Sequence, residues 1–248
     1  MDETMLMTGA SREIGWHAAV AMLAADPGLR MFVTDHTGGL AEGLRDKNGN
    51  PQVYGVPADL SSLDSVRAAA DHVMARAAVT SFVGDAGLQV TGGARRSADG
   101  YEVTFAVDVL ANHLLLRLLG DQLRRVVITG SDTHFGDLRH NLGLAPAPRW
   151  RPPTELARPD QPDTAVAGRT AYSTSKFSVV YLVHEWAAGA RPVRRRRRPH
   201  RDLTVGAGTI VLACTSVSTS RPIPTTRAGW PPRSAGCGCA GTATSARS

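Results

Sequence analysis

The first 186 residues alternate short apolar runs with longer segments that have the apolar spacing of helices, and this alternation restricts the fold more than any other feature. Strands joined by helices of about 10–20 residues require right-handed crossovers, which place the strands parallel in one sheet. The sequence therefore predicts an α/β fold, a single domain with a doubly wound parallel sheet. The predicted strands are Met5–Thr8, Arg30–Thr34, Gln52–Val56, Val79–Val83 and Arg125–Thr129, and the predicted helices are Ile14–Ala25, Ser62–Ala77, Ala98–Leu119 and Arg169–Ala188.

The positive charge of the chain lies at its C-terminal end. Eleven arginines and one acid lie from Ala187 onward, whereas the preceding 186 residues hold 17 basic and 21 acidic residues. A run such as Arg194–Arg198 is typical of nucleic-acid patches and targeting signals. However, the chain has no recognisable base-reading motif and no aromatic residues among these arginines, so we expect no nucleic-acid partner.

Membrane and metal sites are not expected either. No apolar run approaches the roughly 20 residues that span a bilayer, and the N-terminal residues lack the pattern of a secretion signal, so we expect a cytoplasmic protein without membrane contact. The three cysteines, Cys214, Cys237 and Cys239, do not have the spacing of a zinc site.

A stretch of small residues, MLMTGASREIG, connects the first predicted strand to the first helix. Small side chains there let backbone N–H groups approach a pyrophosphate at the positive end of a helix. Asp35 ends the second strand, where a carboxylate can accept both hydroxyls of an adenosine ribose. Asp59 and Leu60 end the third strand, in a position to meet the adenine ring. A plain strand–helix turn is the alternative, and the two acids argue against it.

A candidate catalytic pair lies at the start of the last predicted helix, in AYSTSK. Tyr172 and Lys176 are four residues apart and therefore share one helix face. A lysine ammonium one turn away favours the phenolate form of a tyrosine, which makes acid–base chemistry accessible near neutral pH. Ser131 ends the fifth strand, at the edge where α/β sheets place their ligands, and its hydroxyl can hydrogen-bond a substrate carbonyl oxygen.

These motifs, in this order, resemble those of the short-chain dehydrogenase/reductase family. Thr8-Gly9-Ala10-Ser11-Arg12-Glu13-Ile14-Gly15 is similar to the family's TGxxxGxG turn, and Ser131 precedes the Tyr-x-x-x-Lys motif as it does in the family. The resemblance implies a Rossmann fold and an NAD(P)-dependent oxidoreductase that moves a hydride between nicotinamide and a small-molecule carbonyl or alcohol. It implies Tyr172 as proton donor, Ser131 as substrate orienter, and Lys176 as the residue that activates Tyr172 and binds the nicotinamide ribose. It also allows a homo-oligomer.

Further matches define the implied site and the branch. Ser81–Gly87 stands where the family has an NNAG-like segment, with Ala86 and Gly87 retained, and Ala98–Leu119 is similar to a helix of retinol-dehydrogenase-like and protochlorophyllide-reductase-like members. Asp108 stands in that helix in place of the asparagine of the family's catalytic tetrad. The catalytic residues implied are Ser131, Tyr172, Lys176 and Asp108; those implied to bind the cofactor are Thr8, Gly9, Ser11, Arg12, Ile14, Gly15, Asp35, Asp59, Leu60, Ala86, Gly87, Tyr172 and Lys176.

The chain also departs from the family pattern. Glu13 replaces the middle glycine, where a side chain crowds the cofactor and its charge opposes a pyrophosphate, and Asp108 can pair with Lys176 and weaken its effect on Tyr172. A protein that binds a dinucleotide with little or no catalysis is therefore the alternative function. The cofactor is NAD or NADP: Arg12 resembles a basic residue of NADP-dependent members, but Asp35 would repel a 2′-phosphate, which favours NAD.

Three regions are predicted along the chain. Residues 1–190 form the Rossmann domain with the cofactor and catalytic sites, and residues 132–168 form an insertion expected to cover the substrate cleft. Residues 191–248 read as an irregular basic tail with one candidate strand, Thr209–Cys214.

The family pattern ends abruptly at the arginine run, where a strand of the type Val-Asp-Val-Val is expected. We hypothesise that the tail is out-of-frame translation of a GC-rich gene, because GAC GTC GAC GTC GTC read two bases later gives consecutive arginine codons. Sequencing the coding DNA tests this hypothesis. It is wrong if no single-base shift restores a Val-Asp-Val-Val strand followed by a Pro-Gly turn.

Overall fold

A computed structural model of the chain describes residues 3–90, 95–120, 122–141, 143, 145–159, 162–189 and 209–215. The described strands form one sheet in the order β3-β2-β1-β4-β5-β6, and every neighbouring pair is parallel. The strands are β1 (Thr4–Thr8), β2 (Arg30–Asp35), β3 (Val53–Pro57), β4 (Ser81–Gly84), β5 (Arg125–Ser131) and β6 (Thr209–Thr215). The predicted doubly wound α/β fold is confirmed.

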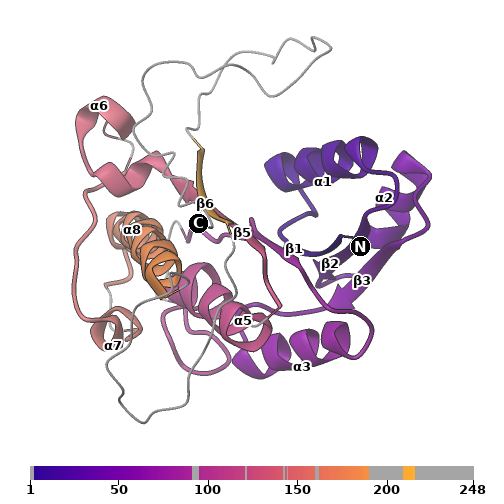
Figure 1. Cartoon of the computed structure of the whole chain (residues 1–248). Helices are drawn as coiled ribbons and strands as arrows, with labels where there is room; N and C mark the ends of the chain where they lie inside the picture. Colours follow the sequence, from indigo (N-terminus) through magenta and orange to yellow (C-terminus); the bar gives the residue numbers. More distant parts are fainter. Residues whose placement is uncertain are drawn as a thin grey trace, which may run out of the picture.

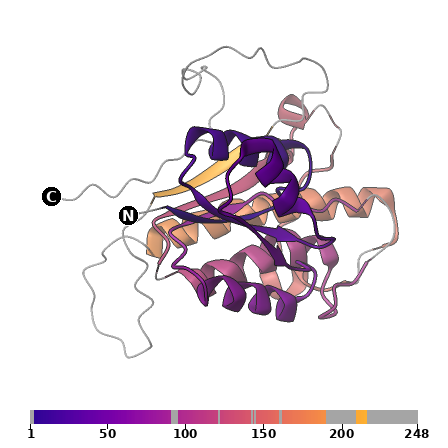
Figure 2. The same cartoon turned by 90° about the vertical axis from the view of Figure 1, so that its right-hand side faces the viewer.

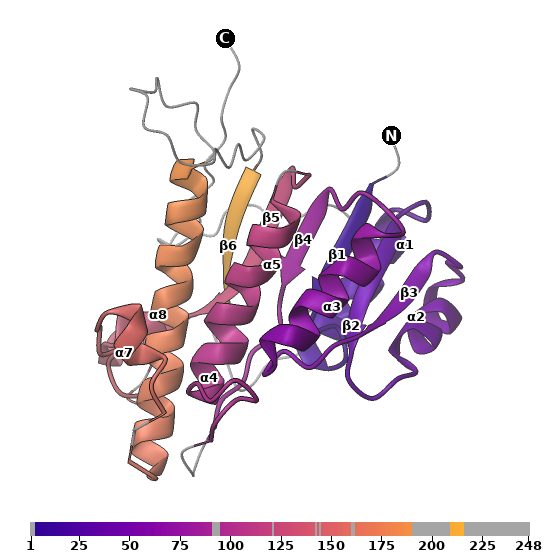
Figure 3. The same cartoon turned by 90° about the horizontal axis from the view of Figure 1, so that it is seen from below.

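Helices cover both faces of the sheet (Figures 1 and 2). On one face lie α1 (Glu13–Ala25) and α2 (Leu40–Asn48), which enclose a core around Met7, Met31 and Val33. On the other lie α3 (Leu63–Met74), α5 (Ala111–Leu119) and α8 (Ala165–Gly189), side by side in Figure 3. The larger core on that face includes the fully buried rings of Phe32 and Phe82. Because both faces are covered, β1 is buried along its whole length, as its continuous apolar sequence requires.

The register of the central strands brings three chain segments together at one edge of the sheet. Thr8 of β1 is paired with Gly84 of β4, and Gly84 is paired with Ile128 of β5. The residues that follow, Gly9, Asp85 and Thr129, therefore emerge side by side at the carboxyl edge. This is the edge where open α/β sheets bind their ligands.

Capping residues set the helix starts, and two starts differ from the sequence prediction. The helix predicted from Ala98 begins at Val103, because the Glu102 carboxylate accepts hydrogen bonds from the backbone N–H groups of Thr104 and Phe105. The helix predicted from Arg169 begins at Ala165, where Thr164 accepts from the N–H of Ala167. The predicted cap of α3 is present, with Ser62 Oγ accepting from the Ser65 N–H at 3.3 Å.

Several short elements complete the described chain. Val103–Phe105 (α4) leads into a π-helical turn, η1 (Ala106–Leu110), before α5 begins. The segment between β5 and α8 contains the 3-10 helix η2 (Asp132–Phe135) and the short helices α6 (Leu138–Asn141) and α7 (Pro153–Leu156). Helix α2 was not predicted, because its nine residues are mostly polar and include Gly43.

Within residues 191–248, for which an irregular tail is predicted, the structure describes one strand. This strand, β6, pairs with β5 from Arg125↔Thr209 to Ser131↔Thr215 and coincides with the candidate strand Thr209–Cys214. The arginine run Arg194–Arg198 and the cysteines Cys237 and Cys239 lie outside the described residues. No helix in the described part of the chain is long and apolar enough to cross a membrane.

Candidate functional site

The turn after β1 is closed by contacts that only glycine permits. Gly9 has a φ of +81°, and a Cβ there would lie 2.4 Å from the backbone nitrogen of Ala86. A Cβ on Gly15 would lie 2.1 Å from the carbonyl oxygen of Gly9. Thr8 joins the turn to the next strand, since its hydroxyl accepts from the Ala86 N–H at 3.2 Å and its carbonyl accepts from the Asp85 N–H. The turn is thus packed directly against the segment that follows β4.

Glu13 occupies the left-handed backbone conformation that the turn requires. Its φ is +46°, and it is the only described non-glycine residue with a positive φ. Such a conformation costs an L-residue roughly 1–2 kcal/mol. The backbone therefore retains the shape of a glycine-containing turn although the sequence supplies a glutamate, and the Glu13 side chain is exposed at the start of α1.

The remaining predicted cofactor residues of the turn lie at its surface. Ser11, Arg12 and Ile14 are all exposed, with Ile14 at 51%. An exposed isoleucine beside a guanidinium provides an apolar contact and a positive charge for a ligand. These features, with the small residues Gly9 and Gly15, fit a dinucleotide; the Glu13 carboxylate is the one feature of the turn that opposes a pyrophosphate.

Asp35 lies at the end of β2 as predicted, but its carboxylate already accepts three hydrogen bonds. Oδ1 accepts from the N–H groups of Thr37 (3.1 Å) and Gly38 (2.9 Å), and Oδ2 accepts from Leu40 N–H (2.8 Å). Burial raises the pKa of Asp35, but these N–H donors outweigh it and hold the pKa below its ordinary value. Asp35 therefore orders the loop that leads into α2, and its carboxylate keeps lone pairs for a ribose.

The acid and the apolar residue predicted to meet an adenine ring are also held in place. Asp59 Oδ1 accepts from the backbone N–H and the hydroxyl of Ser61, at 2.9 and 2.7 Å. Leu60 is half-buried and packs against the larger core. Both residues lie just beyond the end of β3, at the same edge of the sheet as Asp35.

Lys176 is buried at the centre of the candidate catalytic site. Only 4% of the residue is exposed, and its Nζ donates to the Thr129 carbonyl oxygen at 3.2 Å. Nζ lies 5.6 Å from the centroid of the Tyr172 ring, one helical turn away. A Cβ on Gly87 would lie 3.0 Å from Nζ, so that this retained glycine makes room for the ammonium group.

The ion pair between Asp108 and Lys176, expected from the sequence, is present. Asp108 is fully buried in the π-helical turn η1, and its Oδ2 lies 3.8 Å from Nζ. Oδ2 also accepts from the Ser175 hydroxyl at 2.7 Å, and Oδ1 accepts from Leu88 N–H at 2.8 Å. Burial raises the pKa of Asp108 above its ordinary value and outweighs Lys176, Ser175 and Leu88, which act in the opposite direction.

Ser131 and Tyr172 lie on elements that pack against each other. Ser131 is 4% exposed at the end of β5, and its Oγ accepts from the Thr133 hydroxyl at 3.1 Å. Tyr172 is half-buried on α8, which packs against β5 and η2. Ser131 thus lies on β5, Tyr172 and Lys176 lie on α8, and Asp108 lies on η1. Helix α8 contacts both β5 and η1.

Two residues of this site, Ser175 and Thr129, were not singled out from the sequence. Ser175 bonds Asp108, as described above, and Thr129 donates from Oγ1 to Asp85 Oδ1 at 2.6 Å. A Cβ on Gly15 would lie 2.5 Å from Asp85 Oδ2, so Asp85 also borders the dinucleotide turn. Their positions gave a signal, since Thr129 precedes Ser131 by two residues and Ser175 adjoins Lys176, but neither residue type is diagnostic by itself.

The aromatic residues and histidines of the insertion between β5 and α8 have packing roles. Trp150 packs against Phe177 and Tyr181, with ring centroids 5.8 and 4.8 Å away, and the rings of His134 and His140 each stack on Phe135. None of these residues lines the pocket that lies beside α8, to which the insertion contributes Arg149, Arg151 and Leu156.

Comparisons with known proteins agree with the fold. No family model matches the sequence. A curated relative, the polyprenol dehydrogenase of Danio rerio, is 28% identical over 143 residues, which cover 53% of this chain and 44% of that protein. The chain thus matches less than half the length of this relative.

Solved short-chain dehydrogenases superpose on the chain. One from Burkholderia phymatum with NAD is 21% identical, with a TM-score of 0.56 over 86% of this chain and 65% of that one. One from Sphingobium yanoikuyae with NADPH is 19% identical, with a TM-score of 0.58 over 86% and 70%. RhlG of Pseudomonas aeruginosa with NADP is 23% identical, with a TM-score of 0.54 over 75% and 66%. The chain therefore has the fold of solved short-chain dehydrogenases, which its motifs resemble.

The left-handed conformation of Glu13 leads to a stability prediction. We expect Glu13→Gly to raise the free energy of unfolding by about 1 kcal/mol, because glycine removes the strain but costs some chain entropy in the unfolded state. Urea denaturation measures this change. We also expect NADH to bind on the order of fivefold more tightly, since a charge opposing the pyrophosphate is removed.

Glu13→Ala is the matched control, because it removes the charge and keeps a Cβ in the left-handed conformation. It should improve NADH binding without the gain in stability. Equal stability of the glycine and alanine variants would contradict the assignment of strain to this position.

Proposed function

We propose that the protein is an NAD(P)-dependent oxidoreductase that acts on a small-molecule carbonyl or alcohol. The observation that carries the proposal is the buried ammonium of Lys176, held one helical turn from Tyr172 at the carboxyl edge of a Rossmann sheet. A buried lysine needs a compensating role or partner, and this one lies next to a group whose ionisation it favours. The named activity of the curated relative, a dehydrogenase, supports the same reaction class.

The residues of the chain have distinct roles in this reaction. The dinucleotide, when bound, supplies or accepts a hydride at its nicotinamide ring. In reduction the Tyr172 hydroxyl donates its proton to the substrate carbonyl oxygen, and in oxidation the phenolate takes the proton from the alcohol. The Ser131 hydroxyl hydrogen-bonds the same oxygen and orients it, and the Lys176 ammonium stabilises the phenolate.

The cofactor would lie along the carboxyl edge of the sheet. The turn from Thr8 to Gly15 would hold its pyrophosphate, Asp35 its adenosine ribose, and Asp59 and Leu60 its adenine ring. Ala86 and Gly87 would border the nicotinamide half beside Lys176. We favour NAD over NADP, because the ionised Asp35 carboxylate would repel a 2′-phosphate more strongly than the exposed Arg12 would attract it.

The proposal is tested by following NADH and NADPH oxidation at 340 nm with a panel of ketones and aldehydes. We expect turnover with NADH, and a loss of roughly 100-fold to 10,000-fold in kcat for Tyr172→Phe, because the proton donor is removed. Tyr181→Phe is the matched control, since Tyr181 lies on the same helix and is exposed.

The same assay distinguishes the oxidoreductase from the alternative function, a protein that binds a dinucleotide without catalysis. Thermal stabilisation by NADH without turnover on any substrate would indicate a protein that binds a dinucleotide without catalysis. Turnover that is unchanged in Tyr172→Phe would contradict the role of Tyr172.

The ion pair of Asp108 predicts an effect on the pH dependence. In alcohol oxidation, where the Tyr172 phenolate accepts the proton, we expect Asp108→Asn to move the acidic limb of the kcat/KM profile to lower pH and to raise turnover at neutral pH several-fold, on the order of 1 kcal/mol. Without the carboxylate, the field of the Lys176 ammonium acts on Tyr172 alone. An asparagine Oδ1 can still accept from Leu88 N–H.

Ser175→Ala is the control for this prediction, because it removes a hydrogen bond to Asp108 but leaves the negative charge. Its profile should stay close to that of the wild type. Identical profiles for the wild type and Asp108→Asn would show that the ion pair does not influence the reaction.

A further inference from the structure

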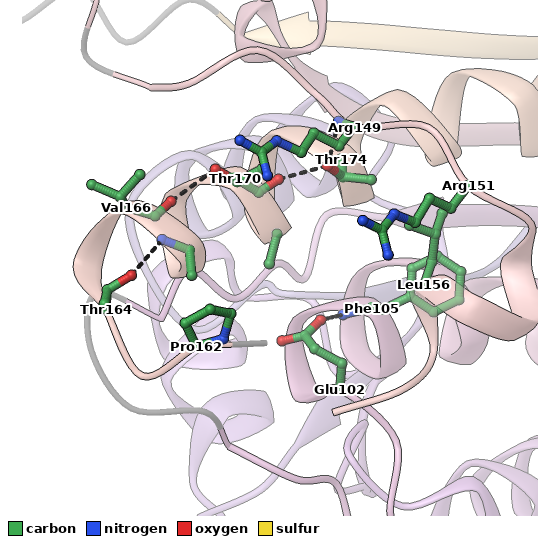
Figure 4. A pocket seen from close by; sticks show the side chains of 12 residues that line it. Glu102, Phe105, Arg149, Arg151, Leu156, Pro162, Thr164, Val166, Thr170 and Thr174 are labelled. Atoms are coloured by element: carbon green, nitrogen blue, oxygen red, sulfur yellow. Dashed lines mark hydrogen bonds between the residues drawn. The ribbon is translucent and has the colours of Figure 1, made fainter. Parts of the chain in front are cut away.

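A pocket lies beside the N-terminal half of α8, between this helix, the start of α4 and the insertion (Figure 4). Its cavity volume is ≈ 200 Å³. Helix α8 contributes Thr170, Ala171 and Thr174, while Arg149 and Arg151 come from the insertion. None of the residues predicted to be catalytic or to bind the cofactor lines it.

The pocket is on the other side of α8 from the candidate catalytic residues. At 100° per residue, Thr170, Ala171 and Thr174 fall within one third of the helix circumference. Tyr172 and Lys176 fall on the opposite side, where Lys176 meets β5 and η1. The pocket is therefore separate from the site at the carboxyl edge of the sheet.

Two arginines give the pocket its charge. The side chains of Arg149 and Arg151 border the cavity, with the Arg151 guanidinium directed toward its middle (Figure 4). Among the described residues, neither guanidinium has a carboxylate within ion-pairing distance. The Arg149 backbone is fixed, since its N–H donates to Thr174 Oγ1 at 3.0 Å, and Thr174 is 5% exposed. Among the described residues, both guanidinium groups are thus available to an anion at the border of the cavity.

The one acid that lines the pocket does not neutralise these arginines. Glu102 is 8% exposed, and both of its carboxylate oxygens accept N–H groups at the start of α4. Burial is the main influence on this carboxyl and raises its pKa. The charged lining therefore consists of two exposed guanidinium groups and a buried carboxyl that already has partners.

The rest of the lining is mostly apolar. Phe105 and Leu156 are 4% and 8% exposed, and Val166 and Ala167 lie on the first turn of α8. The volume is below the roughly 300–1,000 Å³ of sites that hold drug-sized ligands, so that a short chain fills it. Guanidinium groups bind carboxylates through two parallel hydrogen bonds, and an apolar wall favours a hydrocarbon chain on the other end of the ligand.

We propose that this pocket is a second ligand site, which binds a small monocarboxylate with a short apolar chain. Arg149 and Arg151 hold the carboxylate, and Phe105, Leu156 and Val166 contact the chain. Binding at this site needs neither the dinucleotide nor Tyr172. The proposal can therefore be tested independently of the proposed oxidoreductase activity.

Isothermal titration calorimetry of the full chain with hexanoate tests the proposal. We expect saturable binding to the wild type, a dissociation constant at least about tenfold weaker in the double variant Arg149→Gln/Arg151→Gln, and no binding of 1-hexanol. Arg169→Gln is the matched control, because Arg169 is an exposed arginine of α8 that does not line the pocket. It should bind hexanoate like the wild type.

Two further arms define the ligand class. Val166→Ser should weaken hexanoate binding and leave acetate binding unchanged, since Val166 is 62% exposed and its replacement does not disturb the core. Tyr172→Phe should bind hexanoate normally. Absence of hexanoate binding to the wild type, unchanged binding in the double arginine variant, or equally tight binding of inorganic phosphate would each overturn the proposal.

Discussion

The burial of the Lys176 ammonium is the constraint on which the rest of the candidate site depends. A charge that is 4% exposed is tolerated only if hydrogen bonds and opposite charges replace its water. Here the Thr129 carbonyl and the Asp108 carboxylate do so, from β5 and η1, while the lysine itself comes from α8. One side chain thus fixes three elements relative to one another. It also explains why Gly87 is retained, since any side chain there would meet the ammonium group.

Thr129 connects Lys176 to the glycine-containing turn after β1. Its carbonyl oxygen accepts from Lys176, and its hydroxyl donates to Asp85, whose other carboxylate oxygen borders Gly15. Lys176 and the glycine-containing turn after β1 are therefore the two ends of one packed chain of contacts across the carboxyl edge of the sheet. Parallel register makes this chain of contacts possible, because it aligns the ends of β1, β4 and β5. A substitution at Asp85 would therefore alter the surroundings of both Thr129 and Gly15.

The sequence predicted the strands well and placed Tyr172 and Lys176 on one face of α8, because both predictions depend on local patterns. Continuous apolar runs identify buried parallel strands, and the spacing of Tyr172 and Lys176 places them on one helix face. What the sequence could not predict depends on contacts between distant segments. The three N–H groups that occupy Asp35 come from a loop whose path is set by packing, and the start of α8 depends on a cap at Thr164. The pocket beside α8 combines α4, α8 and the insertion, which no local pattern relates.

The two acidic replacements in the site differ in what the surroundings allow. Glu13 is exposed, so its carboxylate can turn into solvent and be screened, and its main cost is the left-handed backbone. Asp108 is fully buried and held by Ser175 and Leu88, so its carboxylate cannot move away from Lys176. At low dielectric a fixed opposite charge at 3.8 Å acts far more strongly than a mobile one in water.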